Sequence, residues 1–431
     1  MSQNNINGKK IYKLAQAIYP ICRSITGKGN RKTLRIIKKI IPNLKIHEIK
    51  SGTKVFDWKI PNEWNPTQAY IVDPNKKKIV DFKKNNLHLV SYSIPINKKI
   101  SLKYLKRKLH FNKKMKNAIP YVCSYYNKDW GFCLSYNNYK KLKKGTYKVK
   151  INSSLKPGSL SYADLLIKGK SDKEILFSSY ICHPSMGNNE VSGPALLTYL
   201  AKYVNGLKNR KYSYRFVLAP ENIGSITYIH RNLKKLKKNV IAAYNITCVG
   251  DNKSYSFLYS KFENSLSDRI ALRAIKISKK KFKYYSFLEY SGSDERRYCS
   301  PGVDIPMCSI MRSKYGSYKE YHTSKDNLSF ISPKGFQGSL NIYKKVIEIF
   351  ETNYFYKIKT ICEPQLGKRN LYPKVSKWPH RDYKKLVGNM SSFLSLADGK
   401  HDLLDISNKV GISYLQTVKI AKKLKKNNLI N

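Results

Sequence analysis

Three groups of polar residues in the middle of the chain have the side chains that metal-assisted hydrolysis needs. His183 and Glu190 lie seven residues apart in SSYICHPSMGNNEVSG, Glu221 lies in FVLAPENIGS, and His322 lies in KEYHTSKD. Imidazole and carboxylate groups are common zinc ligands, and a further carboxylate can accept a proton from an attacking water. Together these residues predict a His/carboxylate/His zinc site with a general base nearby.

Each group also has a purely structural interpretation when it is taken alone. His183 and Glu190 suit a capping loop with one hydrogen-bonded histidine, and Glu221 suits a cap for the helix that follows it. Asp326 suits either a cap for the next helix or a partner that orients a neighbouring histidine. Their shared position favours the chemical interpretation, because all lie at the ends of apolar runs predicted to be strands. Ligands of open α/β sheets bind at such strand ends.

The elements that must position these residues alternate along residues 160–355. EILFSSYI, YRFVLAP and NVIAAYNITCVG are apolar runs typical of buried strands, whereas SGPALLTYLAKYV and SLNIYKKVIEIFETNYF have helical periodicity. This alternation predicts an α/β sheet with helices on both faces. Two further helices are expected within residues 9–42.

The segments on either side of this α/β region have different patterns. Residues 51–150 contain short β-branched runs separated by Pro, Asn and Gly, which predicts a β-rich module. A polar linker with Pro364, Gly367 and Pro373 follows the α/β region. Residues 383–431 then predict two short helices around Gly411, in the manner of a helix-turn-helix.

The composition is strongly basic. The 431 residues include 83 Lys and Arg against 27 Asp and Glu, a formal charge of +56, and 41% are hydrophobic, which argues against global disorder. The lysines are spread over the whole chain instead of forming one patch. This distribution favours solvated faces, with weak non-specific binding of polyanions, over a dedicated nucleic-acid site.

The sequence also bears on the cellular compartment. No apolar run approaches 18 residues, and the first 24 residues lack the features of a signal peptide, so no membrane partner is expected. The eight cysteines include no C-x-x-C pair. We therefore expect reduced thiols and a cytoplasmic protein.

The order of the motifs resembles the bacterial leucyl-aminopeptidase-like family of zinc exopeptidases. The family has a first His ligand, an A-N-D-N-x-S-G loop, A-E-E-x-G, S-D-H-x-x-F with G-I-P, and Y-H-T-x-x-D. In this chain they correspond, in order, to His183, Gly187–Gly193, Ala219–Gly224, Ser293–Pro306 and Tyr321–Asp326. The last motif is the most specific, and the resemblance covers about residues 10–50 and 160–355.

More narrowly, the chain resembles one branch of that family, through PICRSITGKG, CHPSMGNNEVSGP and YGSYKEYHTS. Relatives in this branch are often linked with surface-polysaccharide gene clusters. The resemblance implies an α/β fold: a zinc-exopeptidase-like mixed sheet between helices, an inserted β-rich domain and a C-terminal winged helix-turn-helix domain. The expected domains are 1–50 with 155–360 (aminopeptidase-like), 51–154 (inserted, β-rich) and 361–431 (winged helix).

The chain departs from the family at the residues that would hold a second metal. Asn189 stands at the bridging Asp, and Asn222 stands where a second-metal Glu is expected. The Asp expected near NITCVG falls on Thr247, with Asp251 four residues later. A neutral amide is a poor substitute for a carboxylate that bridges two dications. The resemblance with these departures therefore implies one zinc ion.

The implied site places His183, Glu190 and His322 on the zinc, with Glu221 as the general base. Asp251 is the alternative to Glu190 as a ligand. Several further residues are expected to contact the substrate or to support the ligands: Asp294, Asn189, Asn222, Asp251, Tyr321, Asp326 and Arg312.

The sequence thus predicts a zinc-dependent, aminopeptidase-like metalloprotease or related hydrolase of amide or peptide-like bonds. Its substrate would be a small molecule or a peptide-like molecule, with a link to surface-polysaccharide biosynthesis. The alternative is a catalytically weak ligand-binding scaffold or regulator whose winged helix binds DNA or protein. Nucleic-acid binding through the C-terminal domain is left open but not favoured, and an oligomer is also left open.

Overall fold

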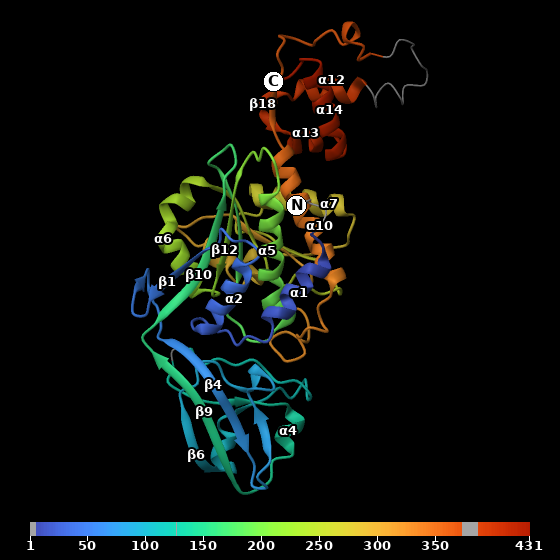
Figure 1. Ribbon diagram of the computed structural model, residues 1–431. Coiled ribbons are helices and arrows are strands. Elements are labelled where there is room, and N and C mark those ends of the chain that lie inside the picture. Colours follow the sequence, from blue (N-terminus) through green and yellow to red (C-terminus); the bar gives the residue numbers. More distant parts are fainter. Residues whose placement is uncertain (1–5, 126, 373–386) are drawn as a thin grey trace. The chain divides into compact units, whose positions relative to one another are not determined.

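The computed structural model describes residues 6–125, 127–372 and 387–431, which form two compact units, Met1–Lys344 and Lys345–Asn431 (Figure 1). Helix α10 (Pro333–Thr352) contributes residues to both units. Among the described residues, no helix is long and apolar enough to cross a membrane.

The first unit is built on an eight-stranded mixed sheet with the order β1-β10-β12-β11-β13-β16-β14-β15. Its central strands β12, β11, β13 and β16 are parallel, and β1 and β10 add an antiparallel edge. Every residue of β11 and β12 is buried, as expected for apolar runs covered on both faces. The strands are β1 (Lys45–Lys50), β10 (Ser159–Ile167), β11 (Glu174–Tyr180), β12 (Ser213–Ala219), β13 (Val240–Asn245), β14 (Ser256–Leu258), β15 (Lys283–Tyr285) and β16 (Met307–Met311).

Helices pack against this sheet and confirm the predicted α/β class. Helix α5 packs on β11 and β12, α7 packs on β13 and β16, and α1 packs on α5. The two helices predicted for residues 9–42 are present as α1 and α2, the first of which begins one residue earlier, at Gly8. The helices are α1 (Gly8–Ile18), α2 (Lys28–Lys38), α5 (Ser192–Asn205), α6 (Ile223–Asn239), α7 (Leu266–Ser278) and the short α8 (Phe287–Tyr290) and α9 (Glu295–Tyr298).

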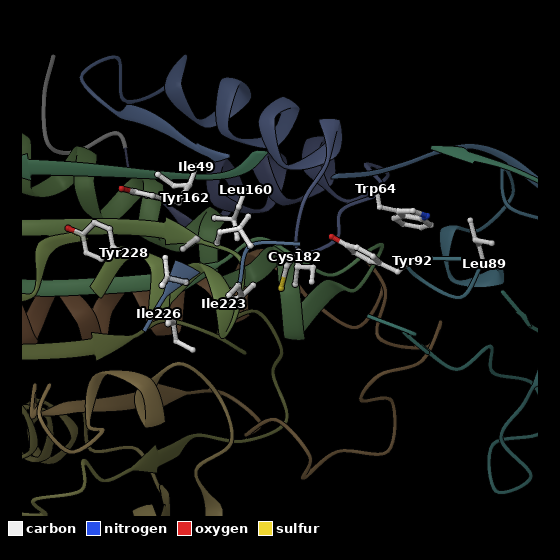
Figure 2. Packing of buried hydrophobic residues seen from close by; sticks show 14 of the residues in the cluster. Ile49, Trp64, Leu89, Tyr92, Leu160, Tyr162, Cys182, Ile223, Ile226 and Tyr228 are labelled. Atoms are coloured by element: carbon white, nitrogen blue, oxygen red, sulfur yellow. The ribbon is translucent and has the colours of Figure 1, made fainter. Parts of the chain in front are cut away.

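The β-rich segment, residues 51–154, carries a four-stranded antiparallel sheet with the order β5-β4-β9-β6. Its core is continuous with that of the large sheet: Figure 2 shows Trp64, Leu89 and Tyr92 in the same buried cluster as Leu160 and Cys182. The domain boundaries predicted from the sequence stay a prediction. The elements are β2 (Lys54–Val55), β3 (Trp58–Lys59), β4 (Glu63–Val72), β5 (Lys78–Asp81), η2 (Asn86–His88), β6 (Ile96–Ser101), α3 (Leu102–Lys106), β7 (Leu109–His110), β8 (Phe132–Cys133), α4 (Tyr136–Lys140) and β9 (Thr146–Lys156).

The second unit contains the predicted helix-turn-helix. Gly411 ends α13 with a φ of 74°, a left-handed conformation that favours glycine, and Ser413 caps α14. Strands β17 and β18 pair antiparallel. The elements after α10 are β17 (Phe355–Lys357), η4 (Gly367–Arg369), α12 (Asn389–Ser395), β18 (Asp398–Asp402), α13 (Leu403–Val410) and α14 (Tyr414–Lys426). Pro373 of the predicted linker and the start of the predicted helical unit, up to residue 386, lie outside the described residues.

Candidate active site

The loops after neighbouring parallel strands position the predicted chemical residues. His183 follows β11, and Glu190 lies in η3 (Gly187–Val191), a π-helical turn that continues into α5. Glu221 follows β12 and precedes α6. Because β11 and β12 are parallel, their carboxyl ends meet at one edge of the sheet and bring these side chains together.

His183 lies between two carboxylates. Its Nδ1 is 2.8 Å from Glu190 Oε2, and its Nε2 is 3.7 Å from Glu221 Oε2. Burial alone would lower the pKa of His183, but the hydrogen bond and the negative charge of Glu190 outweigh it and raise the pKa. The imidazole is therefore held through Nδ1, and Nε2 faces the second carboxylate.

Arg23 lies behind Glu190 and was not predicted as a site residue. It comes from the turn between α1 and α2, where its Nε is 3.5 Å from Glu190 Oε1 and its Nη1 donates to the carbonyl of Ile18. Both side chains of the ion pair are almost fully buried. Burial lowers the pKa of Arg23, and the charge of Glu190 opposes that effect. The sequence contained one indication of a buried arginine, because Arg23 is the charged residue of the mostly apolar segment YPICRSI.

Glu221 is bound to a serine and does not cap α6. Ser293 Oγ donates to Glu221 Oε1 at 2.5 Å, and the N-cap residue of α6 is Asn222, with a φ of 62°. Burial raises the pKa of Glu221, although the charge of His183 and the Ser293 hydrogen bond oppose it. A raised carboxylate pKa suits a group that accepts and returns a proton near neutral pH. Glu221 thus does not take the predicted cap role, and its role as the general base stays a prediction.

His322 lies in the loop before α10, among aromatic rings. The predicted Tyr321 stacks on it with a centroid distance of 3.9 Å, and the His183 ring is 5.5 Å away. Tyr121 of the β-rich segment, which sequence reasoning missed, meets both imidazoles edge-on. Burial, together with the charge of His183, lowers the pKa of His322 to about 3, so the imidazole is neutral at physiological pH.

Asp326 fastens η3 instead of orienting a histidine. Its Oδ1 accepts the backbone N–H of Asn188 at 2.6 Å, and its Oδ2 accepts that of Asn189 at 3.0 Å and the hydroxyl of Tyr318 at 2.8 Å. Burial raises the pKa of Asp326 to about 6. Asp326 thus caps a turn that precedes it by some 140 residues, and not the next helix, which was one of the two predicted roles.

Asp251, the alternative metal ligand, is occupied by structural hydrogen bonds. Its Oδ2 accepts from Asn188 Nδ2 and from the Ser313 backbone, both at 2.9 Å. Its Oδ1 accepts from Ser313 Oγ and from the Lys253 backbone. This network does not favour Asp251 as a ligand.

The two asparagines at the departing positions are held in different ways. Asn189 Nδ2 donates to the Tyr180 hydroxyl at 2.8 Å, while its Oδ1 is buried without a hydrogen-bond partner among the described residues. Asn222 Oδ1 accepts from Arg297 Nε at 2.8 Å. An amide facing a guanidinium is a poor place for a second dication.

Asp294 lies against Glu221 and the start of α6. Its Oδ1 accepts from the Asn222 backbone at 2.9 Å and from Ser225 Oγ at 2.8 Å. Its Oδ2 is buried and has no hydrogen-bond partner in the described part of the chain. Burial and the charge of Glu221 raise the pKa of Asp294 to about 7. The guanidinium of Arg312, by contrast, stacks on the ring of Tyr255 at 3.7 Å.

Two groups of donors fit a metal ion to different degrees. Atoms of Cys182, His183 and Glu190 lie within 4.8 Å of one another. Burial raises the pKa of the Cys182 thiol well above its ordinary value, and Glu190 is already bound by Arg23 and His183, so this group is better suited to structure. A second set has the side-chain types that zinc prefers, because His183 Nε2 lies 3.7 Å from Glu221 Oε2 and the His322 ring lies 5.5 Å from that of His183.

Comparison with known proteins agrees with this architecture. Residues 12–353 match a family described as a domain of unknown function, DUF4910, and residues 354–431 match a winged helix-turn-helix family. A Clostridium acetobutylicum protein described as a "Putative polysaccharide biosynthesis protein with aminopeptidase-like domain" is 45% identical over 411 residues, covering 94% of this chain and 92% of that protein.

Solved structures share the fold. A crystal structure of a "putative peptidase" from Clostridium acetobutylicum has a TM-score of 0.91 at 43% identity, covering 98% of this chain and 96% of that one. A zinc aminopeptidase from Bacillus subtilis has a TM-score of 0.58 at 13% identity, covering 79% of this chain and 94% of that one. A peptidase M28 precursor from Shewanella amazonensis has a TM-score of 0.56 at 14% identity, covering 80% and 93%. The predicted fold is thus confirmed, and the chain belongs to the DUF4910 family, with a winged helix-turn-helix domain at its C-terminus.

Proposed function

We propose that the protein is a zinc-dependent, aminopeptidase-like hydrolase of amide or peptide-like bonds. The observation that carries the proposal is the 3.7 Å approach of His183 Nε2 to Glu221 Oε2 at the strand ends of this fold. The 45% identical relative described as a polysaccharide biosynthesis protein supports a sugar or amino-acyl conjugate with an amide bond as the substrate.

The proposed metal donors are His183 Nε2, the neutral imidazole of His322 and Asn189 Oδ1. Zinc bound there would polarise the substrate carbonyl and lower the pKa of a water molecule. Glu190, which the sequence predicts as a ligand, is proposed instead to orient His183. A carboxylate on the far nitrogen of a histidine fixes its tautomer and ring orientation. Arg23 in turn forms an ion pair with the other oxygen of Glu190, at 3.5 Å.

Glu221 is the proposed general base. Its Oε1 is held by Ser293, which leaves Oε2 on the side of His183 to accept a proton. The Glu221 side chain is 18% exposed, so it is the carboxylate of the site that solvent and substrate can reach, whereas Glu190 is fully buried. Burial raises the pKa of Glu221 above its ordinary value, the direction that makes a carboxylate a better proton acceptor.

A single metal ion is proposed, as the sequence implies. Asn222 is bound to Arg297, and Asp251 is occupied by Asn188 and Ser313. At the positions that would hold a second dication, this chain therefore has residues that are neutral or are already hydrogen-bonded to other residues of the protein.

The test combines metal content with turnover. We expect one zinc per chain, and we expect Glu221→Gln to keep that zinc while it lowers turnover of an amide or N-acyl-sugar panel about 100-fold or more. Glu289→Gln, at an exposed carboxylate of the same unit, is the matched control and should behave as wild type. A wild-type protein without tightly bound metal, or a Glu221→Gln protein with full turnover, would refute the proposal.

Glu190→Gln separates the two roles of Glu190. An orienting residue should leave one zinc per chain with a 10–100-fold weaker affinity, about the effect typical of residues behind a ligand. Loss of the zinc under saturating conditions would make Glu190 a direct ligand, as the sequence predicts.

One observation supports the alternative of a regulator. Helix α14 exposes Lys419, Lys422, Lys423, Lys425 and Lys426 in a unit that matches a winged helix family. A duplex-DNA titration of the full chain at two salt concentrations tests this alternative. Sequence-selective binding that is lost when the five lysines are changed to Gln would favour it.

A further inference from the structure

Three rings from different parts of the chain meet at the candidate site. The Tyr121 ring centroid lies 5.2 Å from that of His183 and 5.3 Å from that of His322, and the two imidazoles are 5.5 Å apart. Tyr121 presents an edge to both, at interplanar angles of 64° and 85°. The tyrosine therefore touches both proposed histidine ligands at once.

The backbone of the same segment holds the His322 loop. Tyr121 N–H donates to the carbonyl of His322 at 2.8 Å, and Pro120 pairs antiparallel with Thr323. Ser324 completes the pairing, because its backbone N–H donates to the Ile119 carbonyl at 2.8 Å and its Oγ accepts from the Ile119 N–H at 3.0 Å. Residues 119–121 and 322–324 thus form a short ladder.

This ladder supports a residue with an uncommon backbone conformation. His322 has a φ of 54°, in the left-handed region, which few residues other than glycine adopt, although histidine is among those enriched there. Such a conformation persists only where the surroundings impose it. Here the carbonyl of His322 is fixed by Tyr121, and its ring is fixed between the face of Tyr321 and the edge of Tyr121.

Tyr121 is in turn anchored to the β-rich segment. The next residues, 122–124, pair with Ser91: Ser91 N–H donates to the Val122 carbonyl, and Ser124 N–H donates to the Ser91 carbonyl, both at 3.0 Å. Tyr92, which follows Ser91, stacks on Trp64 in the buried core. Tyr121 therefore connects the packed core of this segment with the histidines.

We propose that Tyr121 is a positioning residue, through which the β-rich segment sets the geometry of His183 and His322. This inference rests on the proposed metal-dependent function. It makes the segment a part of the site instead of an appended binding module. The ring of Tyr121 does the positioning, because its contacts to both imidazoles are ring contacts, whereas the ladder uses only backbone atoms of Tyr121.

The experiment compares Tyr121→Leu with Tyr121→Phe in the full chain. Zinc affinity is measured by competition with a chelator, and ligand geometry is measured by the visible spectrum of the cobalt-substituted protein. We expect Tyr121→Leu to weaken zinc binding about 10–100-fold and to change the cobalt spectrum, and Tyr121→Phe to stay within about twofold of wild type. The matched control is Tyr139→Leu, a half-buried ring of the same segment that packs against Phe111 at a tilt of 34°.

Wild-type affinity and an unchanged cobalt spectrum in Tyr121→Leu would overturn the inference. If Tyr121→Leu fails to fold, Ser324→Ala takes its place. That variant removes one hydrogen bond of the ladder and should weaken zinc binding about threefold, by the usual value of such a bond. Unchanged affinity in Ser324→Ala would then count against the inference.

A metal-free readout separates this inference from the proposed function. In protein labelled at histidine Cε1, the NMR signals of His183 and His322 should shift and broaden in Tyr121→Leu but not in Tyr121→Phe. If wild type binds no metal while these signals respond, the proposed function fails and the positioning role stands. If the signals are unchanged in Tyr121→Leu, the positioning role fails in either case.

Discussion

The two sides of the candidate site use their polar residues in opposite ways. On one side, called the bonded side, Asp251 and Asp326 accept a hydrogen bond from the protein at each carboxylate oxygen. On the other side, called the reactive side, the facing atoms His183 Nε2 and Glu221 Oε2 are 3.7 Å apart. Carboxylates that suit a metal by type can thus be fully hydrogen-bonded within the fold, whereas the second side leaves His183 Nε2 and Glu221 Oε2 facing each other.

The largest loss of stability should come from breaking the buried ion pair of Arg23 and Glu190, which lies behind His183. Arg23→Met leaves the charge of Glu190 fully buried without its guanidinium, and the loss of one member of such a pair costs about 3–5 kcal/mol of unfolding free energy. Urea denaturation measures it. Glu348→Gln, which breaks the exposed pair with Lys345, is the control and should cost less than about 1 kcal/mol. Equal effects in the two variants would contradict the prediction.

Asp326→Asn tests the bonded side. It replaces a charged acceptor of two backbone N–H groups by an amide, and we expect a loss of about 2–3 kcal/mol in urea denaturation. At low temperature the folded variant should still bind one zinc, because Asp326 is not a proposed donor. Loss of zinc from a folded variant would show that Asp326 contributes to metal binding and would contradict the comparison of the two sides.

Asn189→Asp adds a carboxylate on the reactive side. We expect zinc to bind about tenfold more tightly, still with one ion per chain, because Asn222 and Asp251 stay engaged elsewhere. The matched control is Asn188→Asp, which places a carboxylate against Asp251 and should lower stability without a gain in zinc affinity. Two zinc ions in Asn189→Asp would show that the bonded side can release its ligands.

The smallest effect concerns an ion pair away from both sides. Burial would raise the pKa of Glu63, but hydrogen bonds from Arg31, Asn65 and Ser159 outweigh it and lower the pKa to about 2. A lowered folded-state pKa gives stability that is complete above about pH 4.5 and is lost as the pH falls toward 2. Because the pair is partly solvated, we expect about 1 kcal/mol. The difference in stability between wild type and Glu63→Gln, followed from pH 6 to pH 2, should shrink over this window, and a constant difference would contradict the assignment.

Much of the site follows from sequence, because strand ends and motif order place His183, Glu221 and His322. The hydrogen-bond partners of Asp251 and Glu190 did not follow, since a carboxylate's partners depend on loops that come together only in the fold. Arg23 and Tyr121 were missed for the same reason: their partners lie far away in sequence. The α/β class and the helix-turn-helix followed from periodicity, which depends only on local sequence.

The ladder between residues 119–121 and 322–324 also has a consequence for how the chain folds. Its strands are separated by about 200 residues, as in the Ile119–Ser324 bond with a separation of 205. Contacts at such separation form late, because the entropy of closing the intervening loop is lost before the contact is gained. During synthesis, a ribosome-bound chain that has already completed the β-rich segment still lacks the loop that pairs with it. We therefore expect refolding chains to recover their β-sheet signal before they recover the ability to bind metal.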